Sequence, residues 1–174
     1  MSGRTWLYAD PHFYQTSICQ FTRSDGSKLR PWDNADQMSE DMILWYNEIV
    51  HPEDRVYILG DIAMNRRALD KSLPRLGGRK VLIKGNHDED KLSYYSKYFD
   101  DIRAYTPKKG FVLSHIPIHP GSLSRWGVNI HGHLHSNVVQ LNDEPDPRYV
   151  CVSVEHTNFR PILLDKVLKK AGIK

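Results

Sequence analysis

Cysteine and long hydrophobic runs are both scarce in this sequence. Cys19 and Cys151 are its only cysteines, too few for a disulfide framework and not spaced as a thiolate metal site. No apolar run approaches the roughly 20 residues that a membrane-spanning helix needs. The first ten residues contain no basic segment followed by an apolar stretch, so no secretory signal is expected. These absences favour a cytoplasmic protein without a membrane partner.

An excess of one charge is also absent. The chain carries 24 lysines and arginines against 21 aspartates and glutamates, a net charge of +3. This mild positive charge tolerates an anionic substrate but falls short of the basic footprint of a dedicated nucleic-acid binder. The sequence also has no internal repeat, low-complexity tract or linker. Because a domain averages roughly 150 residues, we expect residues 1–174 to form a single domain, with the oligomeric state left open.

Short β-branched or aromatic runs alternate with helical periodicity along the chain. This alternation is typical of a layered α/β architecture. Strands are predicted at 5–10, 55–61, 79–85, 111–115, 128–132 and 149–155, with weaker candidates at 102–105 and 138–141. Helices are predicted at 34–50, 66–76, 89–99 and 160–172. Pro74 should end or kink the second helix because it has no backbone N–H to donate.

The predicted helix at 34–50 has the clearest pattern. Its apolar face consists of residues spaced by four, three and four positions: Met38, Met42, Trp45 and Ile49. Asn34 is the candidate N-cap, and Gln37 three residues later completes a capping-box pattern. We therefore expect this helix to begin at Asn34 and to pack through that face.

Polar side chains gather just after the predicted strands. Aspartate, histidine and asparagine occupy the carboxyl ends of five of them: Asp10, His12, Asp61, Asn86, His87, Asp88, His115, His133 and His135. One such residue alone is usually a turn former. Five strand ends of this kind are harder to explain as turns, and ligand sites in α/β sheets form at the carboxyl ends of strands. We expect these side chains to converge on one site.

The residue types at these strand ends predict metal binding. Carboxylate, imidazole and amide oxygen without thiolate favour Mn²⁺, with iron or Zn²⁺ as alternatives. Seven of the side chains exceed the needs of a single ion: Asp10, His12, Asp61, Asn86, His115, His133 and His135. Two ions about 3.5–4 Å apart, bridged by one carboxylate and a water, would use them all. The remaining positive field would attract a phosphate group.

The order and spacing of these residues resemble those of a known family. Residues 10–12 (DPH), 60–61 (GD), 85–88 (GNHD), His115 and 132–135 (GHLH) resemble the five ordered motifs of the calcineurin-like metallophosphoesterases. The resemblance spans most of the chain and is to the small, single-domain prokaryotic or phage type. It implies an α/β fold in which two mixed β-sheets pack as a sandwich flanked by α-helices.

The resemblance also implies a role for each residue. One ion would be held by Asp10, His12, Asp61 and His135, and the other by Asp61, Asn86, His115 and His133. A metal-bridging hydroxide would attack phosphorus in line. His87 would assist the leaving group, with Asp88 orienting its ring. A general acid must keep a free proton, which a metal-bound nitrogen does not offer.

Departures from other branches of that family narrow the expected function. Residues 60–67 read GDIAMNRR instead of the GDxVDRG of Ser/Thr protein phosphatases, and the chain is too short for the added DNA-binding parts of repair nucleases. We expect a phosphoesterase acting on a phosphorylated small molecule, a phosphodiester or a nucleotide. The alternatives are a nuclease or end phosphatase acting on nucleic acid and a non-catalytic scaffold. The basic run at 66–84 suits a polynucleotide, but such a run is more often a solvated face.

Three loops are candidates for substrate contact. Residues 13–34 mix aromatic and basic side chains, which either bind bases and phosphates or attach the loop to the domain. Arg125 in the loop 116–129 is a candidate phosphate clamp, with a surface ion pair as the alternative. Asn158 and Arg160 follow the last predicted strand and either face the site or begin the final helix.

His131 stands apart from the other two histidines of NIHGHLHSN. The three share one parity, so an extended backbone would point them to the same side. His131 nevertheless lies outside the GHLH motif. We expect it to support or pack beneath the site without binding metal.

Overall fold

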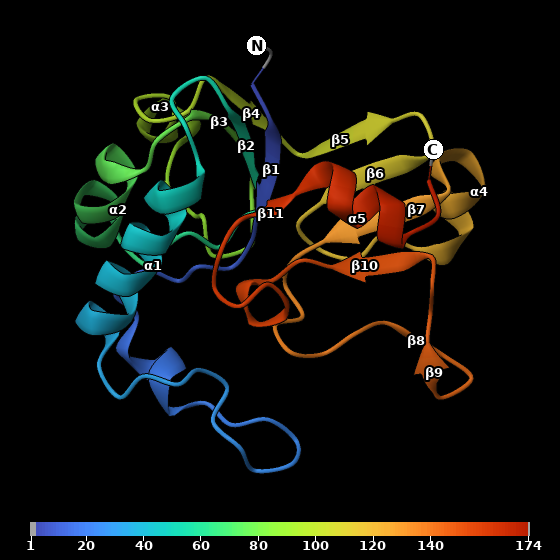
Figure 1. Ribbon diagram of the computed structural model, residues 1–174, viewed down its shortest axis with the longest axis horizontal. Helices are drawn as coiled ribbons and strands as arrows, with labels where there is room; N and C mark the ends of the chain where they lie inside the picture. The colour runs from blue at the N-terminus through green and yellow to red at the C-terminus, as the bar shows by residue number, and fades with distance from the viewer. Residues whose placement is uncertain (1–2, 174) are drawn as a thin grey trace.

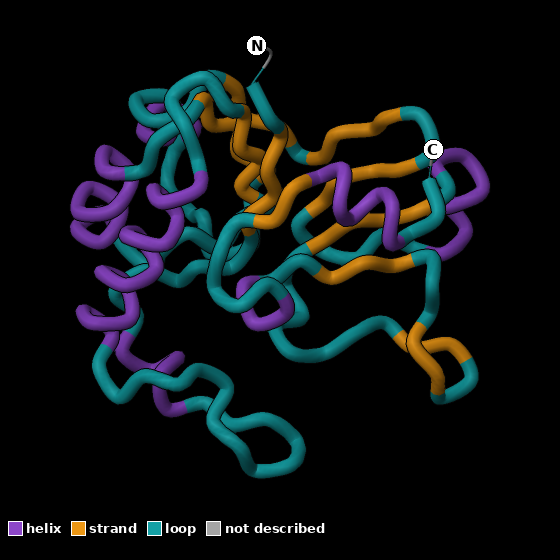
Figure 2. The backbone as a smooth tube through the Cα atoms, viewed as in Figure 1, coloured by secondary structure: helices purple, strands orange, loops and turns teal. Residues whose placement is uncertain are grey.

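The computed structural model describes residues 3–173 and has an α/β architecture, as the sequence predicts (Figures 1 and 2). The strands are β1 (Thr5–Tyr8), β2 (Arg55–Ile58), β3 (Arg79–Ile83), β4 (Asp101–Arg103), β5 (Tyr105–Lys108), β6 (Phe111–Ser114), β7 (Val128–His131), β8 (Gln140–Leu141), β9 (Glu144–Pro145), β10 (Tyr149–Cys151) and β11 (Ile162–Leu163). The α-helices are α1 (Ala35–Ile49), α2 (Arg66–Ser72), α3 (Leu92–Tyr95), α4 (Leu123–Trp126) and α5 (Leu164–Lys170).

The larger sheet is mixed and runs in the order β11-β1-β2-β3-β4. β1 to β4 are parallel, with Trp6 opposite Val56, and β11 lies antiparallel to β1 at the edge. Alternate side chains point to opposite faces of β1: Trp6 and Tyr8 pack in the helix-covered core, while Leu7 faces the second sheet. α1 and α2 lie together on that outer face (Figure 1) and supply the crossovers that parallel strands require.

The smaller sheet is also mixed and runs in the order β10-β7-β6-β5. β5 and β6 form an antiparallel hairpin, and the other pairs are parallel. The two sheets meet across an apolar layer to which Leu59 and Ile83 contribute from one side and Leu113 and Ile130 from the other. Val167 of α5 joins the same layer. The two sheets are thereby held as packed layers.

α1 begins and packs much as predicted. The Asn34 side chain accepts the backbone N–H groups of residues 36 and 37 at 2.8 and 3.0 Å, so this half of the capping box forms. Met38 and Met42 are completely buried, as predicted. The next fully buried side chain is Tyr46 rather than Trp45, which is half-buried. Because 3.6 residues make a turn, this shift by one position keeps the same helix face inward.

Two predicted elements change near the C-terminus. The helix predicted over 160–172 is wrong at its start, because residues 162–163 form β11 and α5 begins only at Leu164. β11 supplies partners for backbone groups of β1 that the parallel sheet leaves unpaired on that side. The strand predicted over 149–155 ends at Cys151, and residues 154–156 form a 3-10 turn. α2 ends as predicted, with Pro74 in the following 3-10 turn.

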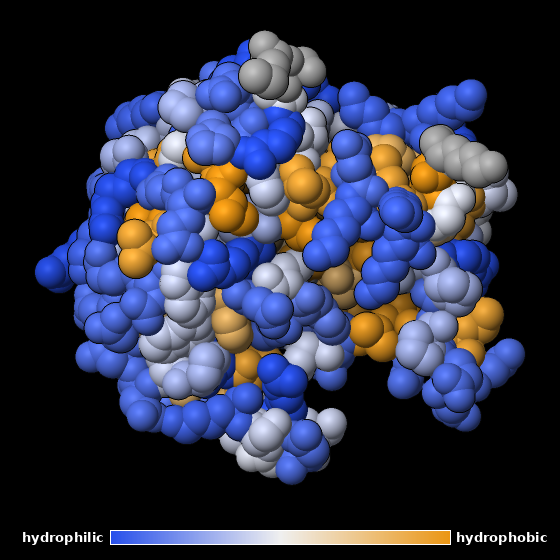
Figure 3. Space-filling view, in the orientation of Figure 1, coloured by the Kyte–Doolittle hydropathy of each residue, from blue (hydrophilic) through white to orange (hydrophobic). Residues whose placement is uncertain are grey.

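Hydrophilic residues cover most of the face shown in Figure 3, and hydrophobic side chains reach the surface around α5. Within residues 3–173, no helix combines the length and apolar character that crossing a membrane requires.

Candidate metal centre

The polar residues of the strand ends converge where the two sheets meet. Asp10, Asp61 and Asn86 follow β1, β2 and β3 of one sheet, and His115 and His133 follow β6 and β7 of the other. The His133 backbone N–H donates to both carboxylate oxygens of Asp10, at 3.0 and 2.9 Å, across 123 residues of sequence. His115 Nε2 lies 3.4 Å from Asp61 Oδ2. The convergence predicted from the strand-end pattern is therefore present.

The backbone is strained at five of these residues. Their φ angles are positive: Asp10 55°, His12 48°, Asp61 52°, His133 69° and His135 51°. Non-glycine residues rarely adopt this left-handed region, which costs on the order of 1–3 kcal/mol per residue. Such strain persists only where the surrounding structure enforces it, and it clusters at functional sites. The positive φ angles thus support a functional role independently of the side-chain chemistry.

Two groups of side chains are close enough to hold a cation, and they share one carboxylate. Ligand atoms of Asp10, His12 and Asp61 lie within 4.8 Å of one another, and so do those of Asp61, His115 and His133. Asp61 belongs to both groups, which is the position expected of a bridging ligand. The arrangement therefore has the form of two adjacent sites.

The ring of His115 is oriented by a backbone carbonyl. Its Nδ1 donates to the Leu59 carbonyl at 2.7 Å, and its Nε2 lies 2.8 Å from Asn86 Oδ1. In a neutral imidazole with Nδ1 protonated, Nε2 is an acceptor and would face the acceptor oxygens of Asn86 and Asp61. Burial opposes protonation of His115, but the hydrogen bond to Asp61 and the charges of Asp10 and Asp61 raise its pKa, so a second ring proton resolves that conflict without a metal. A cation at Nε2 would take the place of that proton, and a carbonyl behind the ring is typical of a metal-binding histidine.

His12 is buried without hydrogen bonds to either ring nitrogen among the residues that the structure describes. Burial lowers the pKa of His12 to about 3, so its imidazole is neutral and keeps a free lone pair. Buried polar atoms almost always have a partner, and one without a protein partner calls for an explanation. A metal ion bound by the His12 ring would provide that partner.

Two glycines allow the backbone to approach the carboxylates closely. A Cβ atom on Gly85 would lie 2.3 Å from Asp61 Oδ1, and one on Gly132 would lie 2.5 Å from Asp10 Oδ2. Both distances are far below van der Waals contact. The glycines of GNHD and GHLH therefore make room for the two carboxylates, and any larger residue would displace them.

The two carboxylates sit in different electrostatic surroundings. Burial raises the pKa of Asp10 to about 6, although Ser153 Oγ donates a 2.6 Å hydrogen bond to it. Burial also opposes ionisation of Asp61, but the hydrogen bond and charge of His115 lower its pKa to about 2. Asp61 is therefore the carboxylate that stays ionised at the centre of the cluster.

Asp88 holds the backbone of the site instead of orienting His87. Its carboxylate accepts the backbone N–H groups of Asp61, Ile62 and Gly85 at 2.9, 3.1 and 2.8 Å. These bonds occupy both oxygens and tie the loop after β2 to the loop after β3. The expectation that Asp88 positions the His87 ring is corrected accordingly, because within residues 3–173 no hydrogen bond joins the two side chains.

His87 keeps its ring free. Its backbone N–H donates to Asp61 Oδ1 at 2.9 Å, and its ring centroid lies 5.7 Å from that of His12. The half-buried side chain lines a cavity of about 340 Å³. His87 thus lies beside the cluster with an imidazole that none of the described residues binds through a hydrogen bond.

His135 is backed by a buried ion pair. Its Nδ1 lies 3.1 Å from Glu155 Oε1, and Arg30 Nη2 lies 2.8 Å from the same oxygen. The Arg30 and Glu155 side chains are both completely buried. Burial opposes ionisation of Glu155, but the His135 hydrogen bond and the Arg30 charge lower its pKa to about 2. The ring centroid of His135 lies 5.1 Å from that of His12. His135 belongs to neither of the two groups whose ligand atoms lie within 4.8 Å of one another.

Arg30 also reaches the backbone of the first motif. Its guanidinium donates to the carbonyls of Asp10 and Pro11, both at 2.7 Å. The loop 13–34 therefore supports the backbone of the first motif through Arg30, whose guanidinium is buried and does not face a substrate. Phe13 is likewise buried in the core, whereas Phe21 is 48% exposed. Most aromatic side chains of this loop therefore attach it to the domain, which was one of the two roles expected for it.

The candidate substrate residues lie at different places. Arg160 pairs with Glu48 at 2.8 Å on α1, so its guanidinium is engaged away from the ligand cluster. Asn158 is exposed, with a positive φ of 54°. Arg125 is exposed, and its guanidinium carbon lies 5.8 Å from the centroid of the Trp126 ring. The structure brings none of the three into contact with the predicted ligands.

His131 lies beneath the cluster, outside both candidate metal groups. It is completely buried, its Nδ1 lies 2.8 Å from the Gly132 carbonyl, and its ring packs edge-on against Tyr149. Burial lowers its pKa to about 4. These contacts fit the packing role expected for His131.

Comparison with known proteins identifies relatives but no activity. The chain is 32% identical over 171 residues to the uncharacterized protein MJ1445 from Methanocaldococcus jannaschii, with 95% of this chain and 90% of that protein covered. It therefore belongs to the same family as MJ1445. The crystal structure of AQ665 from Aquifex aeolicus, a protein of unknown function, matches with a TM-score of 0.71 and 26% identity over 96% of this chain and 98% of that chain. No protein-family model matches the chain.

Proposed function

We propose that this chain, a member of the MJ1445 family, is a two-metal phosphoesterase of the calcineurin-like type. The observation that carries the proposal is the pair of three-residue groups that share Asp61. Two mixed sheets with their ligand-bearing strand ends together agree with the sandwich expected of that fold. The five motifs and the strained backbone at the same residues give further support.

The donor set fits two divalent ions, with Mn²⁺ favoured over iron or Zn²⁺. Asp10, His12, Asp61 and His135 would hold one, and Asp61, Asn86, His115 and His133 the other. When bound, the ions would supply charge that binds phosphate and would acidify a water for attack. Nitrogen and oxygen donors, an unpartnered buried imidazole and two close glycines all agree with this assignment.

His87 is the residue proposed to move a proton. Its ring lies beside the cluster and is free of hydrogen bonds to the described residues, so it can donate to the oxygen of the leaving group. Its backbone N–H fixes it to Asp61, which keeps the ring near the reacting phosphate. Asp88 supports this arrangement through the backbone.

Small phosphodiesters or nucleotides are the proposed substrates in preference to nucleic acid. Three of the seven basic side chains at 66–84 are engaged in ion pairs: Arg66 with Asp90, Lys71 with Asp36 and Arg75 with Glu40. Paired side chains offer little net charge to a polynucleotide backbone. A non-catalytic scaffold is disfavoured because the ligand set and His87 are all present.

Hydrolysis of bis(p-nitrophenyl) phosphate tests the proposal. The protein loaded with Mn²⁺ is expected to release p-nitrophenol, to stop on chelation and to resume when Mn²⁺ is added back. His87→Ala should keep its bound metal while turnover falls about 100- to 10,000-fold, the usual range for a lost general acid. His51→Ala, an exposed histidine after α1, is the matched control. Equal loss of metal in His87→Ala, or no hydrolysis by the loaded protein, would contradict the proposal.

A further inference from the structure

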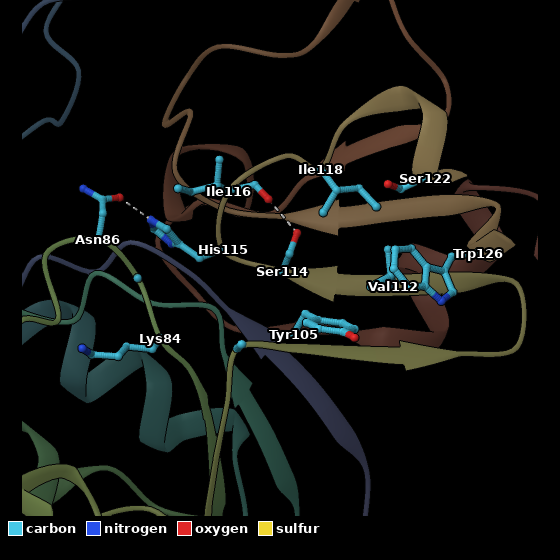
Figure 4. Close-up of a pocket in the computed structure, with 12 residues that line it drawn as sticks. Lys84, Asn86, Tyr105, Val112, Ser114, His115, Ile116, Ile118, Ser122 and Trp126 are labelled. Atoms are coloured by element: carbon cyan, nitrogen blue, oxygen red, sulfur yellow. Dashed lines mark hydrogen bonds between the residues drawn. The ribbon is translucent and has the colours of Figure 1, made fainter. Parts of the chain in front are cut away.

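A cavity of about 530 Å³ opens beside the candidate metal centre. Its near end is formed by Asn86 and His115, which are also predicted metal ligands, and its far end reaches Trp126 of α4 (Figure 4). Small-molecule sites occupy roughly 300–1,000 Å³. The cavity therefore has the size and the position to hold the part of a substrate that extends from a phosphate at the metals.

The far end of the cavity is aromatic. Tyr105 of β5 and Trp126 lie 5.7 Å apart between ring centroids with an interplanar angle of 52°, so the two rings form a wedge. Tyr105 is 49% exposed and Ile116 is 51% exposed, and both line this cavity. Large apolar side chains that are exposed in a concave surface commonly mark a ligand site. Flat aromatic ligands stack on such ring faces.

The residues that line the same end carry hydroxyl groups and no charge, and the nearby Arg125 guanidinium lies 5.8 Å from the centroid of the Trp126 ring. In Figure 4 the Lys84 ammonium points away from Tyr105 and Trp126. The hydroxyls of Tyr105 and Ser122 make no hydrogen bond to any residue in the range 3–173. A neutral flat ring with polar edges suits both the wedge and the hydroxyls.

We propose that this cavity binds the nucleoside part of the substrate, with the base stacked at Tyr105 and Trp126 and the phosphate at the metal centre. A nucleobase is the common neutral aromatic group with hydrogen-bonding edges that is attached to phosphate. The inference rests on the proposed phosphoesterase function and narrows its substrates to nucleotides and nucleoside phosphodiesters. It also gives Tyr105 and Trp126 a role in specificity.

Calorimetric binding to the Mn²⁺-loaded His87→Ala variant, whose turnover is expected to be slowed about 100- to 10,000-fold, tests the inference apart from hydrolysis. The probes are AMP, ribose 5-phosphate and inorganic phosphate, which differ by the base and the sugar. Because stacking of a base on aromatic side chains adds to binding, AMP is expected to bind about 10-fold more tightly than ribose 5-phosphate. Equal affinity for these two probes would overturn the inference.

Variants then locate the base. Trp126→Leu and Tyr105→Leu keep apolar bulk but remove a ring face, and each should abolish most of the AMP advantage while leaving phosphate affinity unchanged. Trp45→Leu is the matched control, because Trp45 packs against Trp32 outside the cavity. An AMP advantage that survives in both cavity variants would place the base elsewhere and overturn the inference. Because Tyr105 is half exposed, its variant remains informative if Trp126→Leu fails to fold.

The inference and the proposed function fail in different ways. Hydrolysis of bis(p-nitrophenyl) phosphate without preferential binding of AMP would overturn the nucleoside site alone. Preferential binding of AMP without any hydrolysis would overturn the phosphoesterase proposal and leave the cavity as a nucleotide site. If an oligonucleotide is cleaved with at least 10-fold higher kcat/KM than a nucleoside phosphodiester, a polymer is the substrate and the inference is wrong.

Discussion

The candidate metal centre has two halves that differ in what surrounds them. We define the closed half by Asp10, His12 and His135 and the open half by Asn86, His115 and His133. In the closed half, Asp10 and His12 are at most 3% exposed, and a buried ion pair backs the third ligand. In the open half, Asn86 is exposed and two of the ligands line the large cavity. Under the proposed function, the closed half would hold an ion, and the open half would adjoin the space for a substrate.

The halves also differ in how they orient histidine. His115 in the open half donates to the Leu59 backbone carbonyl, which is part of the sheet edge. His135 in the closed half contacts the Glu155 side chain, which in turn needs Arg30 from a distant loop. A backbone carbonyl is present at the strand end whatever the side chains are, whereas a buried carboxylate such as that of Glu155 requires a compensating charge. The closed half therefore depends on more residues outside the motifs.

The largest effect is expected where the halves meet. Asp61→Asn removes the only carboxylate common to both groups, so both ions should be lost or severely weakened. Several kcal/mol of charge stabilisation would go with them, lowering kcat/KM by more than about 1,000-fold. Metal content by mass spectrometry and hydrolysis of bis(p-nitrophenyl) phosphate measure the two effects. Asp70→Asn, a surface carboxylate, is the control. Full metal occupancy in Asp61→Asn would contradict the shared-ligand assignment.

Arg30→Met tests the support of the closed half. The variant removes the Arg30 cation from the buried Glu155 and leaves only His135 beside it, and breaking a buried pair in this way costs about 3–5 kcal/mol. Urea unfolding of the metal-free protein should show this loss. Arg75→Met, which breaks the exposed pair with Glu40, should cost no more than about 1 kcal/mol. If Arg30→Met and Arg75→Met had the same free energy of unfolding, the prediction that the Arg30–Glu155 pair stabilises the closed half would be wrong.

Glu155→Gln separates the two halves in metal binding. The uncharged side chain would hold the His135 ring less firmly, and loss of such a supporting contact typically costs 10- to 100-fold in metal affinity, an order-of-magnitude expectation. Only one of the two Mn²⁺ binding steps should weaken in a calorimetric titration. Glu48→Gln, at the surface pair with Arg160, is the control. Equal weakening of both steps would show that the halves are not separately supported.

His131→Gln should have the smallest effect. His131 belongs to neither candidate group and packs against Tyr149, so the variant is expected to retain metal and to change kcat/KM by less than about 10-fold, which is under 1.4 kcal/mol. The same change at His133 should cost far more. Comparable losses in the two variants would make His131 part of the open half.

Much of the fold follows from local patterns in the sequence. The period of 3.6 in Met38 and Met42 and the helix-ending Pro74 each act over a few residues, and the structure agrees with both. The bounds agree less well elsewhere, because the strand predicted over 149–155 ends at Cys151 and the helix predicted over 89–99 spans only Leu92–Tyr95. β11 escapes such a pattern because Ile162 and Leu163 become a strand only by pairing with β1. Their local sequence equally suits the start of a helix.

The positions of the polar strand ends were determined by the sequence, because parallel strands bring their carboxyl ends together. Only the tertiary structure decided what supports them. Arg30 and Glu155 are 125 residues apart and meet because loop 13–34 folds under the first motif. Asp88 follows a histidine in the chain, yet its carboxylate turns to the backbone of two strand ends. Buried charges and carboxylates take the partners that packing offers, and a one-dimensional pattern does not contain that geometry.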